Sequence, residues 1–323
     1  MDKTIHWGIL GCGSIARKFA QDLQTVPNAQ LTAVASRSTE NAQNFANQYN
    51  ARTYYTSYEA LCKDDNIDII YIATPHVFHH EQTLLCLHHK KAVLCEKPFA
   101  MNKEQVQEMI TLAQKNKLFL MEALWTYFLP HYQELLSIIN NKELGAIRSL
   151  TADFGYYSTF DPDSRVYNKA LGGGSLLDIG IYPLFAALSM IGYPDDIQAS
   201  ANMTSTGVDE NCHIKLQYKS GVSASLYSTI TKKTKTEAIL VFEEGTIHIH
   251  SQFHKPTSFT IEKNGKKETR KFPVTTFGYN FEAVHAQEML LAGKTESPIM
   301  SFDKSLQLIQ LLDQVRQQIN LIY

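Results

Sequence analysis

The stretch "IHWGILGCGSIARKFAQDL", residues 5–23, sets the architecture of the first part of the chain. Residues 5–10 form an apolar strand candidate, a glycine-containing loop follows, and a helical pattern runs from Ser14 to Leu23. Gly11-x-Gly13-x-x-Ala16 fits the fingerprint of a strand–turn–helix unit that binds a dinucleotide. Its helix N-terminus attracts the pyrophosphate, so we expect contacts from Gly11, Gly13, Ser14 and Ile15. The alternative is a tight turn without a ligand.

Strands and helices alternate strictly over the rest of the first 122 residues. Ile67–Ala73 is a continuous β-branched run, as expected of a strand that is buried on both faces. Asn102 is a candidate cap for the helix that follows it. The other expected strands are 31–36, 92–95 and 118–121, and the expected helices are 39–49, 79–89 and 103–115. This alternation predicts an α/β, doubly wound parallel sheet of the Rossmann type in a domain spanning residues 1–122.

After residue 122 the pattern changes to strand pairs separated by turns that contain glycine, Lys-Ser or Asn-Gly. The pairs lie in "SLTADFGYYS", "CHIKLQYKSG", "VSASLYSTIT", "EAILVFEEGTIHIH" and "FTIEKNGKKETRKF". They predict an open antiparallel sheet of six or more strands. Helical segments at 128–140, 175–190, 281–291 and 303–319 accompany it, which makes residues 123–323 an α+β domain.

Composition excludes several classes of partner. The 323 residues carry a net charge of −2, so no basic excess points to nucleic acid or to an anionic membrane. The longest uncharged apolar stretch, Ile179–Tyr193, is shorter than a membrane span and contains Pro183. The N-terminus lacks the apolar region and cleavage site of a signal peptide. Five cysteines scattered through apolar runs do not suggest disulfides, and we expect a reducing compartment, the cytoplasm.

The end of the second strand, "AVASRS", bears on the choice of cofactor. A site that prefers NAD usually carries Asp or Glu there, to bind the ribose 2′-hydroxyl. This chain has Ser36 and Arg37 instead, and an arginine can bind a 2′-phosphate through two charge-assisted hydrogen bonds. We therefore expect NADP, with NAD still possible. The alternative is that Arg37 is an ordinary surface arginine.

Two further motifs follow buried strands and should lie at the edge of the sheet where ligands bind. "ATPHVFHH" brings Thr74, Pro75, His76 and His79 to that edge, near the cofactor. Several histidines cluster here, but no Cys, Asp or Glu completes a metal-ligand spacing, so we expect no metal.

"VLCEKPFAMN" brings Glu96 and Lys97 to the same edge, and both should lie near the cofactor. A partly desolvated lysine there is a candidate for acid–base chemistry, and Glu96 can hold it by charge. Pro98 ends the strand, and a cis Lys97–Pro98 bond is one way to fix the direction of the lysine. The alternative is an ordinary ion pair that caps a strand.

Together these motifs resemble the Gfo/Idh/MocA oxidoreductase family, and the similarity extends through "FLMEALWTYFLP" (119–130) and "GGGSLLDIGIYPL" (172–184). The last two stretches are similar to the branch of dimeric dihydrodiol dehydrogenases, which are NADP-dependent and act on trans-dihydrodiols and sugars such as xylose. The resemblance implies a catalytic role for Lys97. It also implies a Rossmann domain followed by an open sheet that often forms a homodimer interface.

The chain departs from the commonest family pattern at two positions. His76 stands where many members have Asn, and Asp178-x-Gly-x-Tyr182 ends in Tyr where many have His. Tyrosine at that place matches the dihydrodiol branch. Asp178 and Tyr182 are four residues apart, so on a helix they share a face. The alternative for Tyr182 is a core aromatic residue.

We expect NADP-dependent hydride transfer to or from the carbinol carbon of a small sugar, polyol or vicinal diol. Tyr182 is assigned as the proton acceptor in oxidation, with Lys97 assisting it and Asp178 orienting the pair. The reverse assignment, with Lys97 as the base, is nearly as plausible. Trp125 is a weaker candidate for the substrate pocket. The alternatives are a catalytically silent NADP-binding regulator on the same fold and a structural dimer partner.

Overall fold

The computed structural model describes residues 3–323 and divides into two compact units. The first is built from the chain up to Phe128 together with Thr275–Leu306, and the second from Leu129–Val274 together with Gln307–Tyr323. A boundary between residues 122 and 123 does not capture the return of residues 275–306 to the first unit. The functional roles predicted for the two domains stay a prediction.

The first unit contains the predicted doubly wound parallel sheet. Its six strands have the order β3-β2-β1-β4-β5-β6, and all pairs are parallel. They are β1 (Ile5–Leu10), β2 (Ala29–Ala35), β3 (Thr53–Tyr55), β4 (Ile69–Ile72), β5 (Ala92–Glu96) and β6 (Leu120–Ala123). Every residue of β4 and β5 is buried, because helices cover both faces of the sheet. The strand order changes direction beside β1, which is where open sheets of this type bind ligands.

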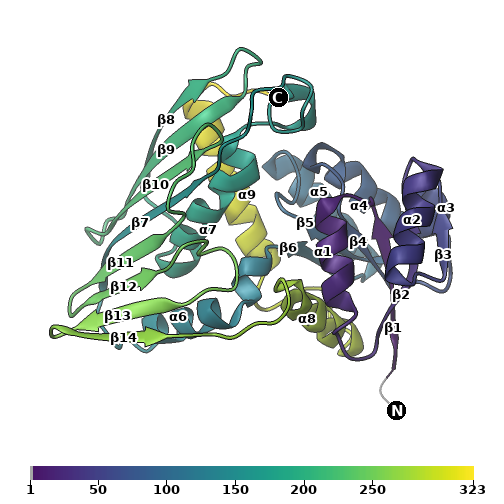
Figure 1. Ribbon diagram of the computed structural model, residues 1–323, viewed down its shortest axis with the longest axis horizontal. Coiled ribbons are helices and arrows are strands. Elements are labelled where there is room, and N and C mark those ends of the chain that lie inside the picture. The colour runs from purple at the N-terminus through teal and green to yellow at the C-terminus, as the bar shows by residue number, and fades with distance from the viewer. Residues whose placement is uncertain (1–2) are drawn as a thin grey trace. The chain divides into compact units, whose positions relative to one another are not determined.

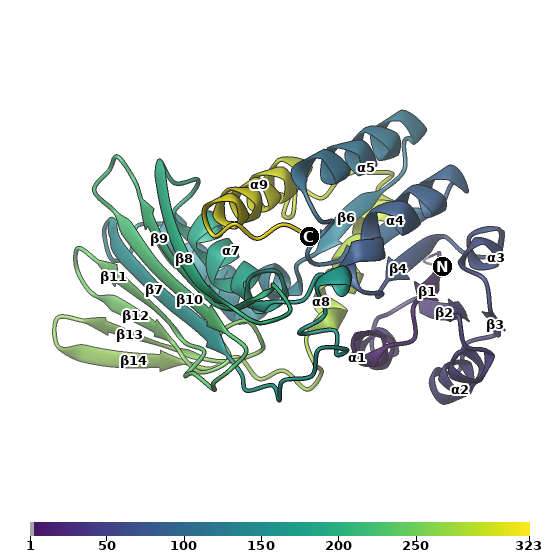
Figure 2. The same ribbon diagram turned by 90° about the horizontal axis from the view of Figure 1, so that it is seen from above.

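The helices of the first unit form two layers, as Figure 2 shows, with α4 and α5 on one face of the sheet and α1 and α2 on the other. The bounds are α1 (Ser14–Leu23), α2 (Thr39–Tyr49), α3 (Tyr58–Cys62), α4 (His79–His88), α5 (Lys103–Asn116) and α8 (Tyr279–Leu291), with short 3₁₀ turns at His76–Phe78 and Trp125–Phe128. As predicted, Asn102 caps α5 by accepting a hydrogen bond from the Gln105 N–H at 2.9 Å. The predicted cis Lys97–Pro98 bond is present.

Helix α8 belongs to the first unit although it lies late in the sequence. The Trp7 indole N–H donates to Gln287 Oε1 at 3.0 Å. Asp22 of α1 accepts hydrogen bonds from the backbone N–H groups of Phe277, Gly278 and Tyr279, at 2.8–3.0 Å. The Asp22 carboxylate therefore satisfies N–H groups at the start of α8 that no helical carbonyl can reach.

The second unit is built on an eight-stranded sheet with the order β14-β13-β12-β11-β7-β10-β9-β8. Its strands are β7 (Ile147–Gly155), β8 (Asp196–Met203), β9 (Asp209–Gln217), β10 (Ser223–Thr229), β11 (Ala238–Phe242), β12 (Thr246–Ile249), β13 (Phe259–Lys263) and β14 (Lys266–Arg270). The predicted antiparallel sheet is confirmed with one difference. β7 and β10 pair in parallel, because a long connection, and not a hairpin turn, separates them in the sequence.

Helices cover one face of this second sheet, and within residues 3–323 no helix covers the other (Figure 1). They are α6 (Pro130–Asn140), a π-helical segment (Leu176–Gly180) that continues into α7 (Ile181–Met190), and α9 (Phe302–Gln318). Gln318 ties the end of α9 to the edge of the sheet, since its Oε1 accepts from the Ala199 N–H at 2.7 Å. Residues Lys169–Met190 are long and apolar enough to cross a membrane. However, 89% of the apolar 18-residue window within them is buried inside the protein, as in a core helix.

Candidate active site

The glycine turn between β1 and α1 is shaped for a close approach of the backbone. Gly11 has a φ of +95°, and a Cβ at this position would lie 2.9 Å from Thr74 Cγ2. Only glycine fits there without displacing the loop that follows β4. Gly13 is in more open space, since a Cβ there would lie 4.0 Å from its nearest neighbour, the Ala73 carbonyl oxygen. Ala16 is fully buried, as close packing of helix on sheet requires.

The N-terminus of α1 differs from those of α2 and α5. Ser38 and Asn102 cap α2 and α5 with their side chains, whereas among the described residues no side chain caps α1. The first-turn N–H groups of α1, at Ser14 and Ile15, are therefore left for an anion. This arrangement fits the pyrophosphate of a dinucleotide.

Ser36 and Arg37 follow β2 at the same edge of the sheet. The Ser36 N–H donates to the Tyr55 carbonyl at 3.2 Å, and its Oγ accepts from the Ser38 N–H at 3.3 Å. These bonds fix the turn between β2 and α2. The Arg37 side chain is exposed, so its guanidinium is accessible to a ligand.

His79 is fully buried and joins two loops at this edge. Its Nδ1 lies 2.8 Å from the Pro98 carbonyl oxygen, and its Nε2 lies 2.9 Å from the Thr74 carbonyl oxygen. Burial lowers the pKa of His79 to about 4, so the ring is neutral at pH 7. A neutral ring carries one N–H, so His79 donates to one of these two carbonyls and contacts the other, and in either tautomer it packs the loop after β4 against the Lys97–Pro98 turn. Its predicted contact with the cofactor stays a prediction, as does that of His76, which is also buried.

Glu96 is the last residue of β5 and anchors the turn that carries Lys97. The Tyr71 hydroxyl donates to Glu96 Oε1, and the Lys97 N–H donates to Glu96 Oε2 at 3.2 Å. Burial raises the pKa of Glu96, whereas the hydrogen bond from Tyr71 and the charge of Lys97 oppose that rise. The lysine and the carboxylate therefore interact as the sequence suggested, while the lysine side chain is only half-buried.

Two further buried carboxyl groups lie near Glu96, and sequence reasoning missed both. Glu122 of β6 accepts a hydrogen bond from the Phe99 N–H at 3.0 Å, and burial raises its pKa to about 7. Glu282 of α8 is fully buried, neither of its oxygens has a hydrogen-bond partner among the described residues, and burial raises its pKa well above the usual range. Both residues stand in largely apolar runs, "FLMEAL" and "NFEAV". A lone acidic residue in such a run was the signal from which a buried carboxyl group could have been predicted.

In the second unit, Asp178 lies in the π-helical segment that precedes α7. Asp178 Oδ2 accepts from the Tyr156 hydroxyl at 2.9 Å, and its Oδ1 accepts from Arg165 at 3.0 Å. The charge of Asp178 is the main cause of a raised pKa at Arg165. Arg165 is a third residue that the sequence reading missed. The predicted role of Asp178 in orienting Tyr182 and Lys97 stays a prediction.

Tyr182 is buried in an aromatic cluster of the second unit. Its ring centroid lies 4.9 Å from that of His254 and 5.7 Å from that of Phe154. Pro183 is the third residue of α7 and follows directly on the π-helical segment, so this helical stretch accommodates a proline that has no N–H to donate. Trp125, the weaker candidate, belongs to the first unit, is buried and stacks on Tyr279 at 4.4 Å. Its contact with substrate stays a prediction.

A buried acid fixes the start of the helical segment that carries Asp178 and Tyr182. Asp209 Oδ2 accepts from the Ser175 hydroxyl at 2.6 Å and from the Leu176 N–H at 2.8 Å. Gly174 is required beside it, because a Cβ there would lie 2.2 Å from Asp209 Oδ1. Burial raises the pKa of Asp209 to about 7.

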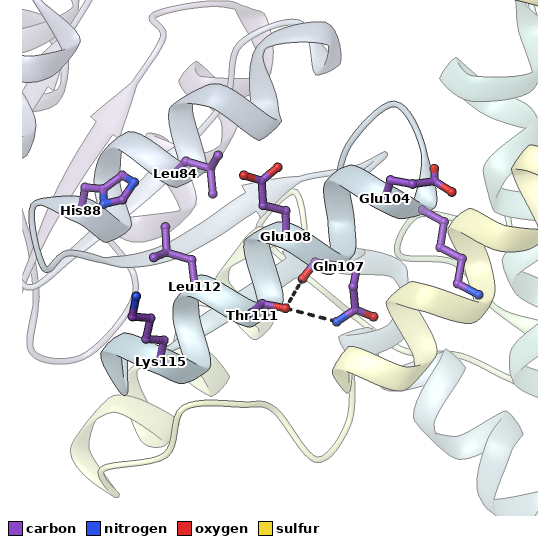
Figure 3. Close-up of a pocket in the computed structure, with 9 residues that line it drawn as sticks. Leu84, His88, Glu104, Gln107, Glu108, Thr111, Leu112 and Lys115 are labelled. Atoms are coloured by element: carbon purple, nitrogen blue, oxygen red, sulfur yellow. Dashed lines mark hydrogen bonds between the residues drawn. The ribbon is translucent and has the colours of Figure 1, made fainter.

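A surface groove of about 720 Å³ lies between α4 and α5, on the outer side of the first unit (Figure 3). None of the predicted site residues lines it. Thr111 and Gln107 are hydrogen-bonded to each other along α5. The lining residues are Leu84, His88, Lys103, Glu104, Gln107, Glu108, Thr111, Leu112 and Lys115.

Comparison with known proteins agrees with this geometry. Residues 5–124 match the model of the oxidoreductase family with an NAD-binding Rossmann fold, and residues 132–248 match the GFO/IDH/MocA C-terminal domain. The chain is 39% identical over 329 residues to trans-1,2-dihydrobenzene-1,2-diol dehydrogenase of Xenopus tropicalis, with 98% of each chain covered. The chain belongs to the Gfo/Idh/MocA oxidoreductase family. The predicted fold and the predicted class, a nicotinamide-dependent oxidoreductase, are confirmed.

Other relatives extend the comparison. The human trans-1,2-dihydrobenzene-1,2-diol dehydrogenase is 34% identical, with 99% of this chain and 98% of that protein covered. A solved structure of KijD10, a 3-ketoreductase from Actinomadura kijaniata in complex with NADP and TDP-benzene, superimposes with a TM-score of 0.88 at 27% identity, with 98% of each chain covered. The resemblance to the dihydrodiol dehydrogenase branch is thereby confirmed.

The first unit brings most of the predicted cofactor residues to one edge of its sheet. The glycine turn follows β1, Ser36 and Arg37 follow β2, Thr74 to His76 follow β4, and Lys97 follows β5. Asp178 and Tyr182 belong to the second unit. Their participation in one catalytic site with Lys97 is a prediction from the sequence and from family membership.

Proposed function

We propose that this chain is an NADP-dependent dehydrogenase that transfers a hydride between the cofactor and the carbinol carbon of a small sugar, polyol or vicinal diol. The observation that carries the proposal is Lys97 at the carboxyl end of β5, anchored by buried Glu96, in a chain that matches diol dehydrogenases over 98% of its length. Family membership makes a cofactor-binding regulator without activity the less favoured alternative.

The residues that would hold NADP are those of the sheet edge in the first unit. The uncapped N-terminus of α1 suits the pyrophosphate, and the exposed Arg37 suits a 2′-phosphate. The nicotinamide ring supplies the hydride chemistry when it is bound. The remaining residues proposed to contact the cofactor are Gly11, Gly13, Ser14, Ile15, Ser36, Thr74, Pro75, His76, His79, Glu96 and Lys97.

The chain itself must orient the substrate and move one proton. In oxidation, Tyr182 accepts the proton of the substrate hydroxyl, and Lys97 as a cation hydrogen-bonds the same oxygen and favours its negative charge. Asp178 orients the pair, itself fixed by Tyr156 and Arg165. Glu96 holds Lys97 by charge and through the Lys97 N–H.

The proposal is tested by measuring nicotinamide absorbance with a panel of sugars, polyols and trans-diols. Tyr182→Phe keeps the ring but removes the proton acceptor, and should lower the rate by about 10²–10⁴ with NADP affinity little changed. Lys97→Met should cost at least as much. Glu108→Gln, a change in the exposed face of α5, is the matched control and should leave the rate unaltered.

Three outcomes distinguish the assignments. If Tyr182→Phe stays near full activity while Lys97→Met is inactive, the lysine is the base and the two roles are reversed. If both variants stay active, the Glu96–Lys97–Pro98 corner is only the end of a strand. If NADP binds but no substrate in the panel is turned over by the wild type, the silent regulator is the better description.

We also propose that the protein is a cytoplasmic homodimer. All five cysteines are free thiols, which suits a reducing compartment. The open face of the second sheet exposes Ile239 by 40% and Val241 by 37%, both on β11, and a second copy of the chain can cover them.

A further inference from the structure

Arg37 is contacted by aromatic residues from two other loops at the same edge of the sheet. Arg37 follows β2, Tyr58 begins α3 just after β3, and Phe78 ends the 3₁₀ turn after β4. The guanidinium carbon of Arg37 lies 5.9 Å from the centroid of the Phe78 ring. Tyr58 lies near enough to Arg37 for the arginine charge to act on its hydroxyl, where it lowers the pKa against the larger, opposite effect of burial. The neighbouring strand order β3-β2-β1-β4 brings these three loops together.

Each contact restricts an otherwise mobile side chain. An exposed arginine ordinarily samples many rotamers, and a ligand that uses it must fix them on binding. Here the Phe78 ring attracts the cation, and the nearby Tyr58 hydroxyl offers an oxygen that can accept one of its N–H groups. The remaining N–H groups of the planar guanidinium stay available, so a second anionic group can be bound through two of them.

Tyr58 adds a hydroxyl without adding negative charge. Burial raises the pKa of Tyr58, and the charge of Arg37 opposes that rise only in part. The hydroxyl is therefore protonated at pH 7 and does not repel a phosphate. A tyrosine hydroxyl can accept a hydrogen bond from a guanidinium and still keep its own O–H as a donor. A carboxylate in its place would pair with Arg37 and neutralise it.

We propose that Tyr58 and Phe78 set the preference for NADP over NAD by holding the Arg37 guanidinium in position for the 2′-phosphate. This inference rests on the proposed function, in which Arg37 binds that phosphate. Tyr58 and Phe78 are positioning residues, because they act on the ligand through Arg37.

The experiment measures dissociation constants by calorimetry for NADP and NAD and for the fragments 2′,5′-ADP and ADP. Tyr58→Phe removes one hydroxyl, and Phe78→Leu removes the ring. We expect Tyr58→Phe to weaken NADP and 2′,5′-ADP by about three- to tenfold, the usual range for one hydrogen bond. Phe78→Leu should weaken them by about two- to fivefold, as for an exposed cation–π contact. Binding of NAD and ADP should change by less than about twofold, which also reports that the unit is folded.

Two matched controls are available in the same unit. Tyr54→Phe removes the hydroxyl of an exposed tyrosine on β3. Phe277→Leu removes a ring that lies 5.8 Å from the Lys18 ammonium, a cation–π contact of the same kind. Neither change should alter the ratio of NADP to NAD affinity.

Repeating both substitutions in the Arg37→Ala variant shows whether Tyr58 and Phe78 act on NADP through Arg37. In that background, Tyr58→Phe and Phe78→Leu should have no further effect on NADP, because both act through the guanidinium. A persisting loss, or an equal loss for NADP and NAD, would mean that these side chains touch the adenosine directly, and would overturn the inference. If Arg37→Ala alone weakens both cofactors equally, the phosphate assignment of Arg37 in the proposed function fails, and the inference fails with it. If Arg37→Ala is selective for NADP but the two aromatic variants are not, only the inference fails.

Discussion

Buried carboxyl groups surround the strand edge that carries Lys97. Glu96, Glu122 and Glu282 are all less than about a tenth exposed, and Lys97 is the cation whose charge acts on Glu96 and Glu122. Three carboxylates cannot all be ionised beside one ammonium group in such a site. Glu96, which receives two hydrogen bonds, is the best placed to stay ionised, and Glu282, which receives none from the described residues, is the best placed to stay protonated.

Glu122 makes the stability of the protein depend on pH. Its pKa is about 7 in the folded chain and about 4.3 in an unfolded one. Folding therefore favours the protonated acid. The stability that this provides is complete below about pH 4 and is lost as the pH rises to 7, at up to about 1.4 kcal/mol per pH unit. Glu122→Gln should remove this part of the slope, since an amide oxygen can still accept from the Phe99 N–H.

Urea unfolding of the cofactor-free wild type and variant, from pH 4 to 8, measures the difference. The exposed Glu40→Gln is the control, and its curve should run parallel to that of the wild type. If the Glu122→Gln curve is also parallel to wild type, Glu122 is ionised in the folded protein and the expected linkage is absent.

For single residues, the local sequence motifs predicted where a residue lies in the fold but not which residues it contacts. Gly11, Arg37 and Lys97 each follow a strand in the sequence, so the edge of the sheet on which they lie could be predicted. The neighbours that define their surroundings come from elsewhere in the chain. Tyr71 bonds Glu96 from 25 residues away, and Arg165 bonds Asp178 across a loop. No short pattern in the sequence specifies such pairs.

Among the elements, those with local signals could be predicted closely. α1 and α2 have the bounds expected from the glycine turn and from a polar start, in which Ser38 caps α2. β3 and α3 were missed because they are only three and five residues long, too short for a periodic pattern. β8 was also missed, because its residues are mostly small or polar. The parallel pairing of β7 with β10 depends on contacts between distant residues.

The attachment of α8 to α1 gives a prediction at the scale of elements. Asp22 is 2% exposed and accepts three backbone N–H groups at the start of α8. Asp22→Ala leaves these donors buried without partners, and should lower the free energy of unfolding by about 2–4 kcal/mol. Asp22→Asn keeps one acceptor oxygen and should recover part of the loss.

The comparison is Asn102→Ala, which removes a single capping bond from α5 and should cost about 1 kcal/mol. Urea denaturation of the three variants ranks them. If Asp22→Ala is no more destabilising than Asn102→Ala, the Asp22 carboxylate does not hold the start of α8.

For the whole molecule, the open face of the second sheet predicts assembly. Ile239 lies on β11 between Thr151 of β7 and His248 of β12, with its side chain 40% exposed. Sedimentation at micromolar concentration should give about twice the chain mass of 36.5 kDa. Ile239→Lys should shift the protein to the monomer, because a lysine there is costly to desolvate in an interface.

Gln43→Lys is the matched control, since Gln43 is an exposed residue of α2 in the first unit, is not part of the second sheet, and gains the same charge. It should leave the dimer intact. A wild type that sediments as one chain at these concentrations would contradict the proposed assembly, and an Ile239→Lys dimer would move the interface to another surface.

The late position of α8 has a consequence for synthesis on the ribosome. Residues up to Phe128 supply all six strands of the first sheet, but Trp7 and Asp22 find their partners only in residues 277–287. Translation proceeds at about 5–20 residues per second, so the emerging chain waits on the order of 8–30 s for α8. During that interval the nascent Rossmann unit exposes an apolar surface that the finished protein covers, and this is the surface that a ribosome-associated chaperone would meet first.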